Sequence, residues 1–330
     1  MAERRERTIS GVEVDGPMGQ NSSGCGLLRE FERLMANTYP NTVQSRDQKL
    51  GSQNSNELSS LFITMEYCAK GDLFDFLKHK VRGYLPANVA NSVFNQILDG
   101  VQCIHEQAGM AHLDLKLENV LLSNDYQMKL CDLGFSQSAF GRLFQLAGTD
   151  GYKAPEIHKI AEGSLYEEEE DNHSSTESTG DNNTLRNAGY AGIQADIFSL
   201  GVILFTLHFG VPPFTEARLT DRFYKLLNFK GGAGNDRKSA LKFFLKSHPS
   251  TKELFTNNMI DYELMDLITS LLAENPNERP SSIGEIRNHP YLLVQAMLTK
   301  KELSDSMRRI VERSEEQELI RAEMQRKSSN

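Results

Sequence analysis

The stretch that most constrains the fold is "ADIFSLGVILFTLHFG", residues 195–210, which is apolar on nearly every side of a helix. A helix that is hydrophobic all round has to be buried, either in the centre of a large domain or in a membrane. The longest apolar run, residues 197–211, is interrupted by Ser, Gly, Thr and His and is shorter than the roughly 20 residues that cross a bilayer. We therefore expect a large helical domain around this segment and no membrane span.

Hydrophobic periodicity predicts further helices along most of the chain. The helical segments are 27–35, 72–81, 87–107, 221–227, 260–273 and 283–298. Short β-branched or apolar runs predict strands at 61–67, 120–123 and 128–132, and the polar run 44–59 is typical of a loop or a loosely paired hairpin. The pattern as a whole predicts an α+β protein that is mostly helical.

Charge and cysteine content exclude several classes of protein. Of the net charge of -9, residues 162–189 contribute -7, with eight acidic residues and one arginine, so the remainder is close to neutral and does not suit nucleic acid. The four cysteines have no paired spacing, which favours reduced thiols over a disulfide or a zinc site. The first residues lack an apolar secretory core. We expect a cytoplasmic protein, with the nucleus also open.

Three short motifs follow one another: "HLDLKLEN" at 112–119, "DLG" at 132–134 and "GTDGYKAPE" at 148–156. In order and spacing they resemble the H-R-D-L-x-x-x-N, D-F-G and A-P-E series of protein kinases. The stretches "MEYCAKGDL", "ADIFSLGVILFTLHFGVPPF" and "NPNERPS" are similar to the hinge, the central helix and a late arginine-bearing segment of that family. The sequence of these segments is most similar to the calcium/calmodulin-dependent and AMP-activated group of serine/threonine kinases.

The resemblance covers Leu27 to Leu293 and implies a protein-kinase-like fold with a complete large lobe and a truncated small lobe that lacks its first strands. The implied divisions are a disordered segment 1–26, a partial small lobe 27–65, a hinge and large lobe 66–296 with an acidic insertion at about 162–189, and a charged helical tail 297–330. A coiled coil, or a regulatory segment that folds back on the body, is the alternative for the tail.

By resemblance, the loop at 112–119 carries phosphoryl transfer from ATP to a protein hydroxyl. Asp114 would orient the hydroxyl and accept its proton, and Lys116 would contact the γ-phosphate as in serine/threonine-specific kinases. Asn119 and Asp132 would hold Mg²⁺ through hard oxygen ligands. Taken singly, Asp and Asn in loops more often cap turns and helices, and only the joint pattern favours catalysis.

The resemblance also implies a nucleotide pocket and a structural frame. The backbone of Glu66 and Cys68 would meet adenine, with Met65 behind it, Leu121 beneath it and Asp72 facing the ribose. Further positions are implied as structural or regulatory: Glu30 on the small-lobe helix, Leu113, Thr149, Glu156 paired with Arg279, and Asp196 holding the backbone of the 112–119 loop.

The small lobe departs from the family pattern. No G-x-G-x-x-G and no lysine precede Glu30 in this sequence, and the only lysine before the hinge is Lys49, which follows the predicted helix. Two interpretations stay open: an incomplete version of an active kinase, or a pseudokinase that works as an interaction module. The first is favoured because Asp114, Lys116, Asn119 and Asp132 are all present.

A second departure concerns regulation. Leu113 stands where the family arginine would bind a phosphate on the activation loop, and residues 139–148 contain no Ser, Thr or Tyr. We expect a loop that is held by apolar residues such as Phe140, Leu143 and Phe144 in place of a phosphate. The acidic insertion is expected to be a surface loop; a role in selecting basic substrates, or its own phosphorylation, is the alternative.

Overall fold

The computed structural model describes residues 45–48, 62–81, 83–162, 189–228, 237–248, 251–252 and 261–328. The predicted N-terminal segment, the helix at 27–35 with Glu30, and residues 163–188 of the insertion lie outside the described residues. Of the small lobe that the sequence predicts at 27–65, the structure therefore describes only residues 45–48 and 62–65.

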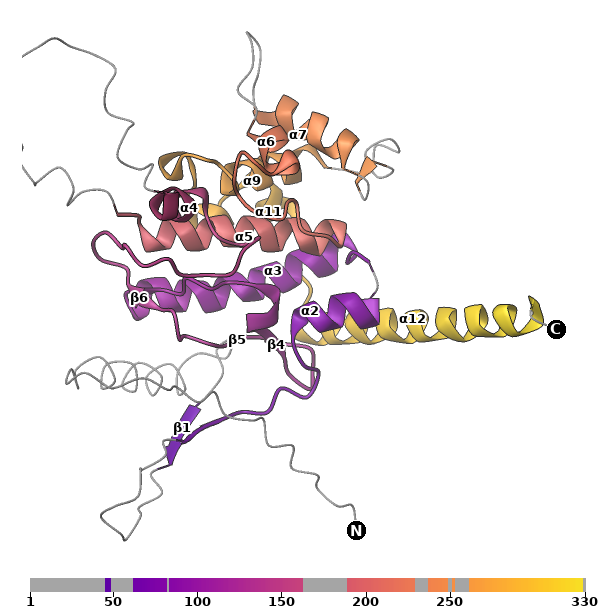
Figure 1. Ribbon diagram of the computed structural model, residues 1–330. Helices are drawn as coiled ribbons and strands as arrows, with labels where there is room; N and C mark the ends of the chain where they lie inside the picture. The colour runs from indigo at the N-terminus through magenta and orange to yellow at the C-terminus, as the bar shows by residue number, and fades with distance from the viewer. Residues whose placement is uncertain are drawn as a thin grey trace, which may run out of the picture.

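Two long helices form the centre of the molecule. Helix α5 (Gly192–Phe209) lies beside α3 (Ala87–Gln102), and α9 (Tyr262–Leu271) packs against α5 (Figure 1). By length and composition α5 could cross a membrane, yet nearly all of it is buried inside the domain, so protein already covers its apolar surface. It ends at Gly210, whose φ of +73° suits glycine.

The remaining helices surround this pair. They are α2 (Leu73–Asp75) with a π-helical continuation Phe76–Val81, α4 (Pro155–Glu162), α6 (Arg222–Leu227), α7 (Arg237–Ser247), α10 (Ile283–Arg287), α11 (Pro290–Val294) and α12 (Lys300–Ser328). The prediction of one helix over 283–298 is wrong. Pro290 cannot extend a helix from the preceding turn, and His289, with ψ of 136°, caps α11 instead.

Short antiparallel pairs supply the strands. β1 (Ser45–Gln48) pairs with β2 (Phe62–Met65), β4 (Val120–Leu122) with β5 (Met128–Leu130), and β3 (Met110–Ala111) with β6 (Gln137–Ser138). The last pair is too short to predict from the sequence. With few strands and many helices, the α+β class and the mostly helical large lobe are confirmed.

Helix α12 packs along its first half. Leu303 and Met307 are fully buried, and this part contacts α3 and the π-helical segment after α2. Farther along, Leu319, Ile320 and Met324 are exposed, and the helix extends away from the body (Figure 1). The predicted tail is thus a helix whose first turns belong to the large lobe.

Close packing between α5 and α9 gives a stability prediction. A Cβ at Gly201 would lie 2.8 Å from Leu271 Cβ and 2.8 Å from Leu272 Cδ2. Gly201→Ala is therefore expected to lower the free energy of unfolding by about 1–3 kcal/mol through overpacking. Gly284→Ala in α10 is the matched control, because its Cβ would meet nothing closer than 3.7 Å. Urea denaturation checks both; equal midpoints would contradict the close approach of the helices.

Candidate active site

The loop 112–119 joins β3 to β4 and is fixed by α5. The fully buried carboxylate of Asp196 accepts hydrogen bonds from the backbone N–H of His112 and of Leu113, each at 2.7 Å, and lies 2.8 Å from His105 Nε2. Leu113 has φ of +65°, a conformation that costs free energy for a residue with a Cβ and that these bonds help to hold. The backbone contact that the sequence predicted for Asp196 is present.

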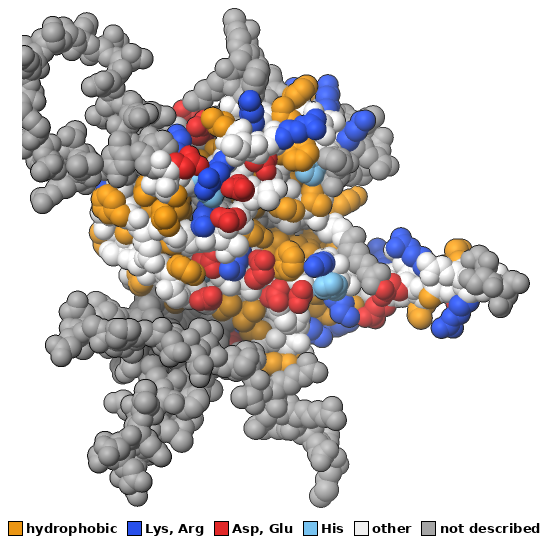
Figure 2. Space-filling view, in the orientation of Figure 1, with side chains coloured by type: hydrophobic (Ala, Val, Ile, Leu, Met, Phe, Trp, Pro, Cys, Tyr) orange, Lys and Arg blue, Asp and Glu red, His pale blue; other side chains and the backbone are white. Residues whose placement is uncertain are grey.

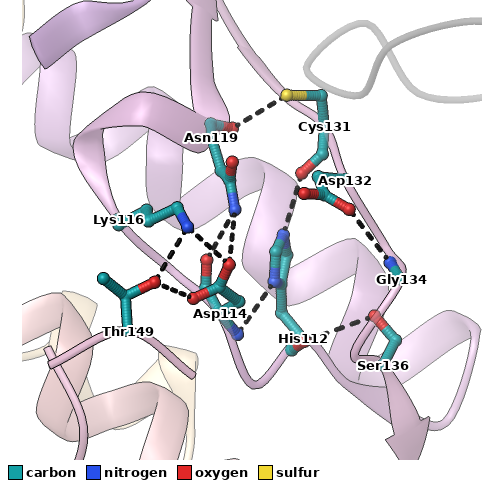
Figure 3. A network of polar contacts seen from close by, with 9 residues as sticks. All are labelled: His112, Asp114, Lys116, Asn119, Cys131, Asp132, Gly134, Ser136 and Thr149. Carbon is teal, nitrogen blue, oxygen red and sulfur yellow. Dashed lines mark hydrogen bonds and ion pairs between the residues drawn. The ribbon is translucent and has the colours of Figure 1, made fainter. Parts of the chain in front are cut away.

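Asp114 is the centre of a polar cluster in this loop (Figure 3). Its carboxylate accepts hydrogen bonds from Lys116 Nζ at 2.8 Å, Thr149 Oγ1 at 2.7 Å and Asn119 Nδ2 at 3.2 Å. Lys116 Nζ also donates to Thr149 Oγ1 at 2.8 Å, and Asn119 Nδ2 to Asp114 O at 2.8 Å. Three donors, from positions 116, 119 and 149 of the sequence, therefore share one buried carboxylate.

Asp132 lies beside this cluster, and His112 links the backbone of Asp114 to that of Cys131, the residue before Asp132. His112 Nδ1 accepts the Asp114 N–H at 3.3 Å, so its Nε2 carries the proton and donates to Cys131 O at 3.1 Å. Asp132 has φ of +62°, and its Oδ1 accepts the Gly134 N–H at 3.2 Å (Figure 3). The chain thus turns sharply at Asp132 and presents the carboxylate next to the 112–119 loop.

Two oxygen atoms of the site are left available for a cation. Within the described part of the chain, no hydrogen bond is made by Asn119 Oδ1 or by Asp132 Oδ2. No group of three or more His, Cys, Asp and Glu side chains that could hold a metal occurs among the described residues. Mg²⁺ does not require one, because it binds through one or two protein ligands together with water and phosphate oxygens. The donor set fits a hard divalent ion.

The hinge is joined to the strand that follows the loop. Asp72 forms a bridge with Leu121, and the Leu122 N–H donates to Gly71 O at 2.8 Å. Asp72 Oδ1 accepts the Asp75 N–H at 2.8 Å and so caps α2. Met65 ends β2 immediately before this hinge. The structure therefore brings the predicted hinge residues and Leu121 to one edge of the site.

Charged and thiol groups line the same edge. Glu66 Oε1 lies 2.9 Å from Lys129 Nζ on β5, which ties the hinge to the sheet. Burial, with the charge of Asp132, raises the pKa of the Cys131 thiol to about 12, and burial also raises the pKa of Cys68. Both thiols are therefore protonated at neutral pH and are weak nucleophiles.

The ion pair predicted between Glu156 and Arg279 is present. The two guanidinium nitrogens Nη1 and Nη2 donate to the two carboxylate oxygens at 2.7 and 2.8 Å, and the Arg279 side chain is fully buried. Arg279 also donates to the carbonyl oxygens of Ala273 and Gln194, each at 2.8 Å. The pair connects the start of α4 to the segment after α9.

The activation loop is held differently from the sequence prediction. Phe140 and Phe144 are 83% and 53% exposed, so they do not anchor it. Leu143 is partly buried against the core, and its backbone exchanges two hydrogen bonds with Tyr190, at 2.8 and 2.9 Å. The Tyr190 hydroxyl donates to Gln145 O at 2.8 Å. The prediction that these two Phe side chains hold the loop is wrong. Whether an apolar side chain in a loop is buried depends on what the loop packs against, which the sequence does not show.

A groove of about 990 Å³ opens beside the 112–119 loop. Leu117, Glu118 and Tyr152 line it near the Asp114 cluster, and Phe223 and His248 line it at α6 and just after α7. The groove thus runs from residues next to the polar cluster to α6 and the end of α7.

Three contributing residues were missed by sequence reasoning: His105, Lys129 and Tyr190. His105 is buried against Asp196 in the π-helical segment Cys103–Gln107 that follows α3, and a lone histidine on an apolar helix gives no sign of such a partner. Tyr190 stands six residues before Asp196, next to the insertion, and could have been noticed as an aromatic residue at the return of the chain.

The geometry agrees with the comparison of the sequence with known families. Residues 28–178 and 181–292 match the family described as the protein kinase domain. The chain belongs to the protein kinase family. The kinase domain is 29% identical over 286 residues to the serine/threonine-protein kinase GIN4 of Saccharomyces cerevisiae, covering 86% of this chain and 20% of that protein.

Other relatives give the same assignment. The kinase domain is 30% identical over 239 residues to the serine/threonine protein kinase OSK3 of Oryza sativa subsp. japonica, covering 72% of this chain and 36% of the relative. It is 36% identical over 162 residues to the phosphorylase b kinase gamma catalytic chain, liver/testis isoform, of Mus musculus, covering 48% and 34%. The chain therefore spans between 20% and 36% of the length of these relatives.

Proposed function

We propose that this kinase domain transfers the γ-phosphate of ATP to serine and threonine hydroxyls of proteins. The observation that carries the proposal is the single cluster in which Lys116, Asn119 and Thr149 all donate to Asp114. This carboxylate is only 3% exposed, and the three donors compensate for its burial. A carboxylate held in this way is oriented before the substrate arrives, which is what proton transfer requires.

In this proposal each side chain of the cluster has a separate task. Asp114 orients the incoming hydroxyl and accepts its proton, and Thr149 occupies the carboxylate oxygen that the substrate hydroxyl would take over. Lys116, 2.8 Å from Asp114, places its positive charge beside the group being transferred. The serine/threonine preference is supported by this lysine and by the named activities of GIN4 and OSK3.

The nucleotide would occupy the edge formed by the hinge and β4. Glu66 and Cys68 would offer backbone groups to adenine, with Met65 behind it and Leu121 beneath it, and Asp72 would face the ribose. Asn119 Oδ1 and Asp132 Oδ2 are the atoms that would hold Mg²⁺, whose charge neutralises developing negative charge on the phosphates. ATP and a divalent ion follow from the family; magnesium is our proposal.

Incorporation of label from [γ-³²P]ATP into a generic protein substrate tests the proposal. We expect label on serine and threonine after acid hydrolysis and none on tyrosine. Loss of label in Asp114→Asn supports the assignment; equal labelling by wild type and Asp114→Asn overturns it.

We further propose that activity does not depend on phosphorylation of the activation loop. Leu113 is buried and cannot bind phosphate, while Tyr190 and Leu143 hold the loop through backbone and hydroxyl hydrogen bonds. Treatment with a protein phosphatase is therefore expected to leave kcat/KM unchanged. Tyr190→Phe, which removes the donor to Gln145 O, is expected to lower it about 2- to 10-fold, the worth of one hydrogen bond. Higher activity after phosphorylation of residues 136–149 would contradict this proposal.

An interaction module without catalysis is the second candidate. One observation favours it: no lysine precedes Glu30 in this sequence, so the family's cation for the α- and β-phosphates has no counterpart there. It predicts no change in melting temperature with Mg-ATP and an unchanged set of bound partners in Asp132→Ala. A rise in melting temperature with Mg-ATP that Asp132→Ala abolishes would exclude it.

A further inference from the structure

Basic side chains are concentrated at one end of a chain that is acidic as a whole. Residues 221–253 contain eight Lys or Arg residues and three Asp or Glu residues, a net charge of +5, whereas the complete chain has -9. This stretch contains α6 and α7. Figure 2 shows Lys and Arg gathered at the end of the molecule where α6 and α7 lie, with hydrophobic side chains among them. We call this surface the α6–α7 face, represented by Arg222, Lys225, Lys242 and Phe243.

The α6–α7 face includes three cations that no carboxylate binds among the described residues. Within the described part of the chain, no carboxylate forms an ion pair with Arg222, Lys225 or Lys242. Two of them lie over aromatic rings instead: Arg222 Cζ is 6.0 Å from the centre of Phe223, and Lys242 Nζ is 4.9 Å from that of Tyr262. Asp221, the residue before α6, accepts the N–H groups of Phe223 and Tyr224 as a helix cap. Unpaired cations of one sign attract anionic partners.

The α6–α7 face also carries an apolar anchor. Phe243 is 57% exposed on α7, directly after Lys242. A phenylalanine between cations suits an acidic polypeptide with apolar side chains better than it suits a nucleic acid phosphate backbone, whose recognition rests on charge and groove shape.

The location of the α6–α7 face connects it to the catalytic loop. Phe223 of α6 and His248, just after α7, line the groove of about 990 Å³ whose other end reaches Leu117 and Glu118. A polypeptide that rests on α6 and α7 can therefore continue along the groove to Leu117 and Glu118, which follow Asp114 in the same loop. This position favours a substrate over a partner that binds away from the site.

We propose that the α6–α7 face binds an acidic segment of the protein substrate and so selects substrates by a docking contact outside the acceptor site. The proposal rests on the proposed kinase function only for the identity of the ligand as a substrate. The binding itself requires no catalysis.

Fluorescence anisotropy measures the binding without nucleotide. The probe is a labelled peptide with the sequence of residues 166–181, "YEEEEDNHSSTESTGD", and its control replaces every Glu by Gln and every Asp by Asn. We expect the acidic peptide to bind and the neutral one not to bind, with affinity that falls as ionic strength rises from about 0.05 to 0.3 M. R222E/K225E is expected to weaken binding about tenfold or more. K300E/K301E, the same charge change on exposed residues of α12, is expected to bind as wild type.

Several outcomes overturn the proposal. One is that the acidic peptide does not bind, and another is that R222E/K225E and K300E/K301E lose the same amount of peptide affinity. A third is that a single-stranded oligonucleotide of equal charge displaces the labelled peptide more strongly than the unlabelled peptide does. Binding that appears only after deletion of residues 163–188 also overturns it, because the chain's own acidic segment would then occupy the face.

A kinetic arm separates this proposal from the kinase function. Fusing the acidic peptide to a generic substrate is expected to lower KM and to leave kcat unchanged. Phosphate transfer without any effect of the fusion would contradict docking and leave catalysis standing. Binding of the peptide to the α6–α7 face in a chain that shows no transfer would support docking and contradict the kinase proposal.

Discussion

Asp114→Asn is expected to lower kcat by about 10²- to 10⁴-fold, the usual contribution of a positioned general base. Asparagine keeps the size of the side chain but cannot accept the substrate proton, and its amide would face the donors Lys116 Nζ and Thr149 Oγ1. KM for ATP is expected to change little, because Asp114 is not among the groups assigned to the nucleotide. Steady-state phosphorylation of a peptide substrate, with both substrates varied, separates the two constants.

Asp125→Asn is the matched control for this change. Asp125 is exposed in the turn between β4 and β5 and undergoes the same loss of charge. It is expected to retain wild-type kcat. A kcat in Asp114→Asn within a factor of about two of wild type, with the fold intact by circular dichroism, would remove Asp114 from the catalytic machinery.

Arg279→Met is expected to lower the free energy of unfolding by about 3–5 kcal/mol, because it leaves the carboxylate of Glu156 buried without its counter-charge. Glu156 is 6% exposed, and both of its oxygens accept from Arg279. The carbonyl oxygens of Ala273 and Gln194 would lose a donor as well. Guanidinium denaturation, monitored by circular dichroism, measures this loss of unfolding free energy.

Arg308→Met and the double variant Glu156→Met/Arg279→Met are its controls. Arg308 lies on the exposed side of α12, so its replacement is expected to cost less than about 1 kcal/mol. The double variant removes both charges and is expected to be more stable than Arg279→Met alone. If Arg279→Met and Arg308→Met unfold at the same denaturant concentration, the buried pair does not have the assigned role.

The sequence predicted the centre of the fold because one signal is unusually strong. A segment that is apolar on all sides, as at 195–210, has to be buried, and α5 is buried along nearly its whole length. The helices at 87–107 and 260–273 followed from amphipathic spacing and were found. Helix α7 was not predicted, because its apolar residues alternate with several lysines and form only a short apolar stripe along the helix.

The polar cluster was predictable in its members but not in its contacts. The spacing of Asp114, Lys116 and Asn119 resembles a family motif, whereas the hydrogen bond from Thr149 crosses 35 positions and has no local signal. The anchoring of the activation loop was predicted in principle and wrong in detail. Tyr190 anchors the loop through backbone hydrogen bonds, and Phe140 and Phe144 are exposed. Backbone hydrogen bonds cannot be predicted from the pattern of side chains along the sequence.

We expect this chain to transfer phosphate although no lysine precedes Glu30 in the sequence. A single-turnover experiment tests it most directly: purified chain in excess over [γ-³²P]ATP, with Mg²⁺ and a generic protein substrate, followed to completion. We expect transfer of label to serine or threonine of the substrate that depends on Asp114 and Asp132. Recovery of all label as ATP, from a chain that remains folded, would contradict it.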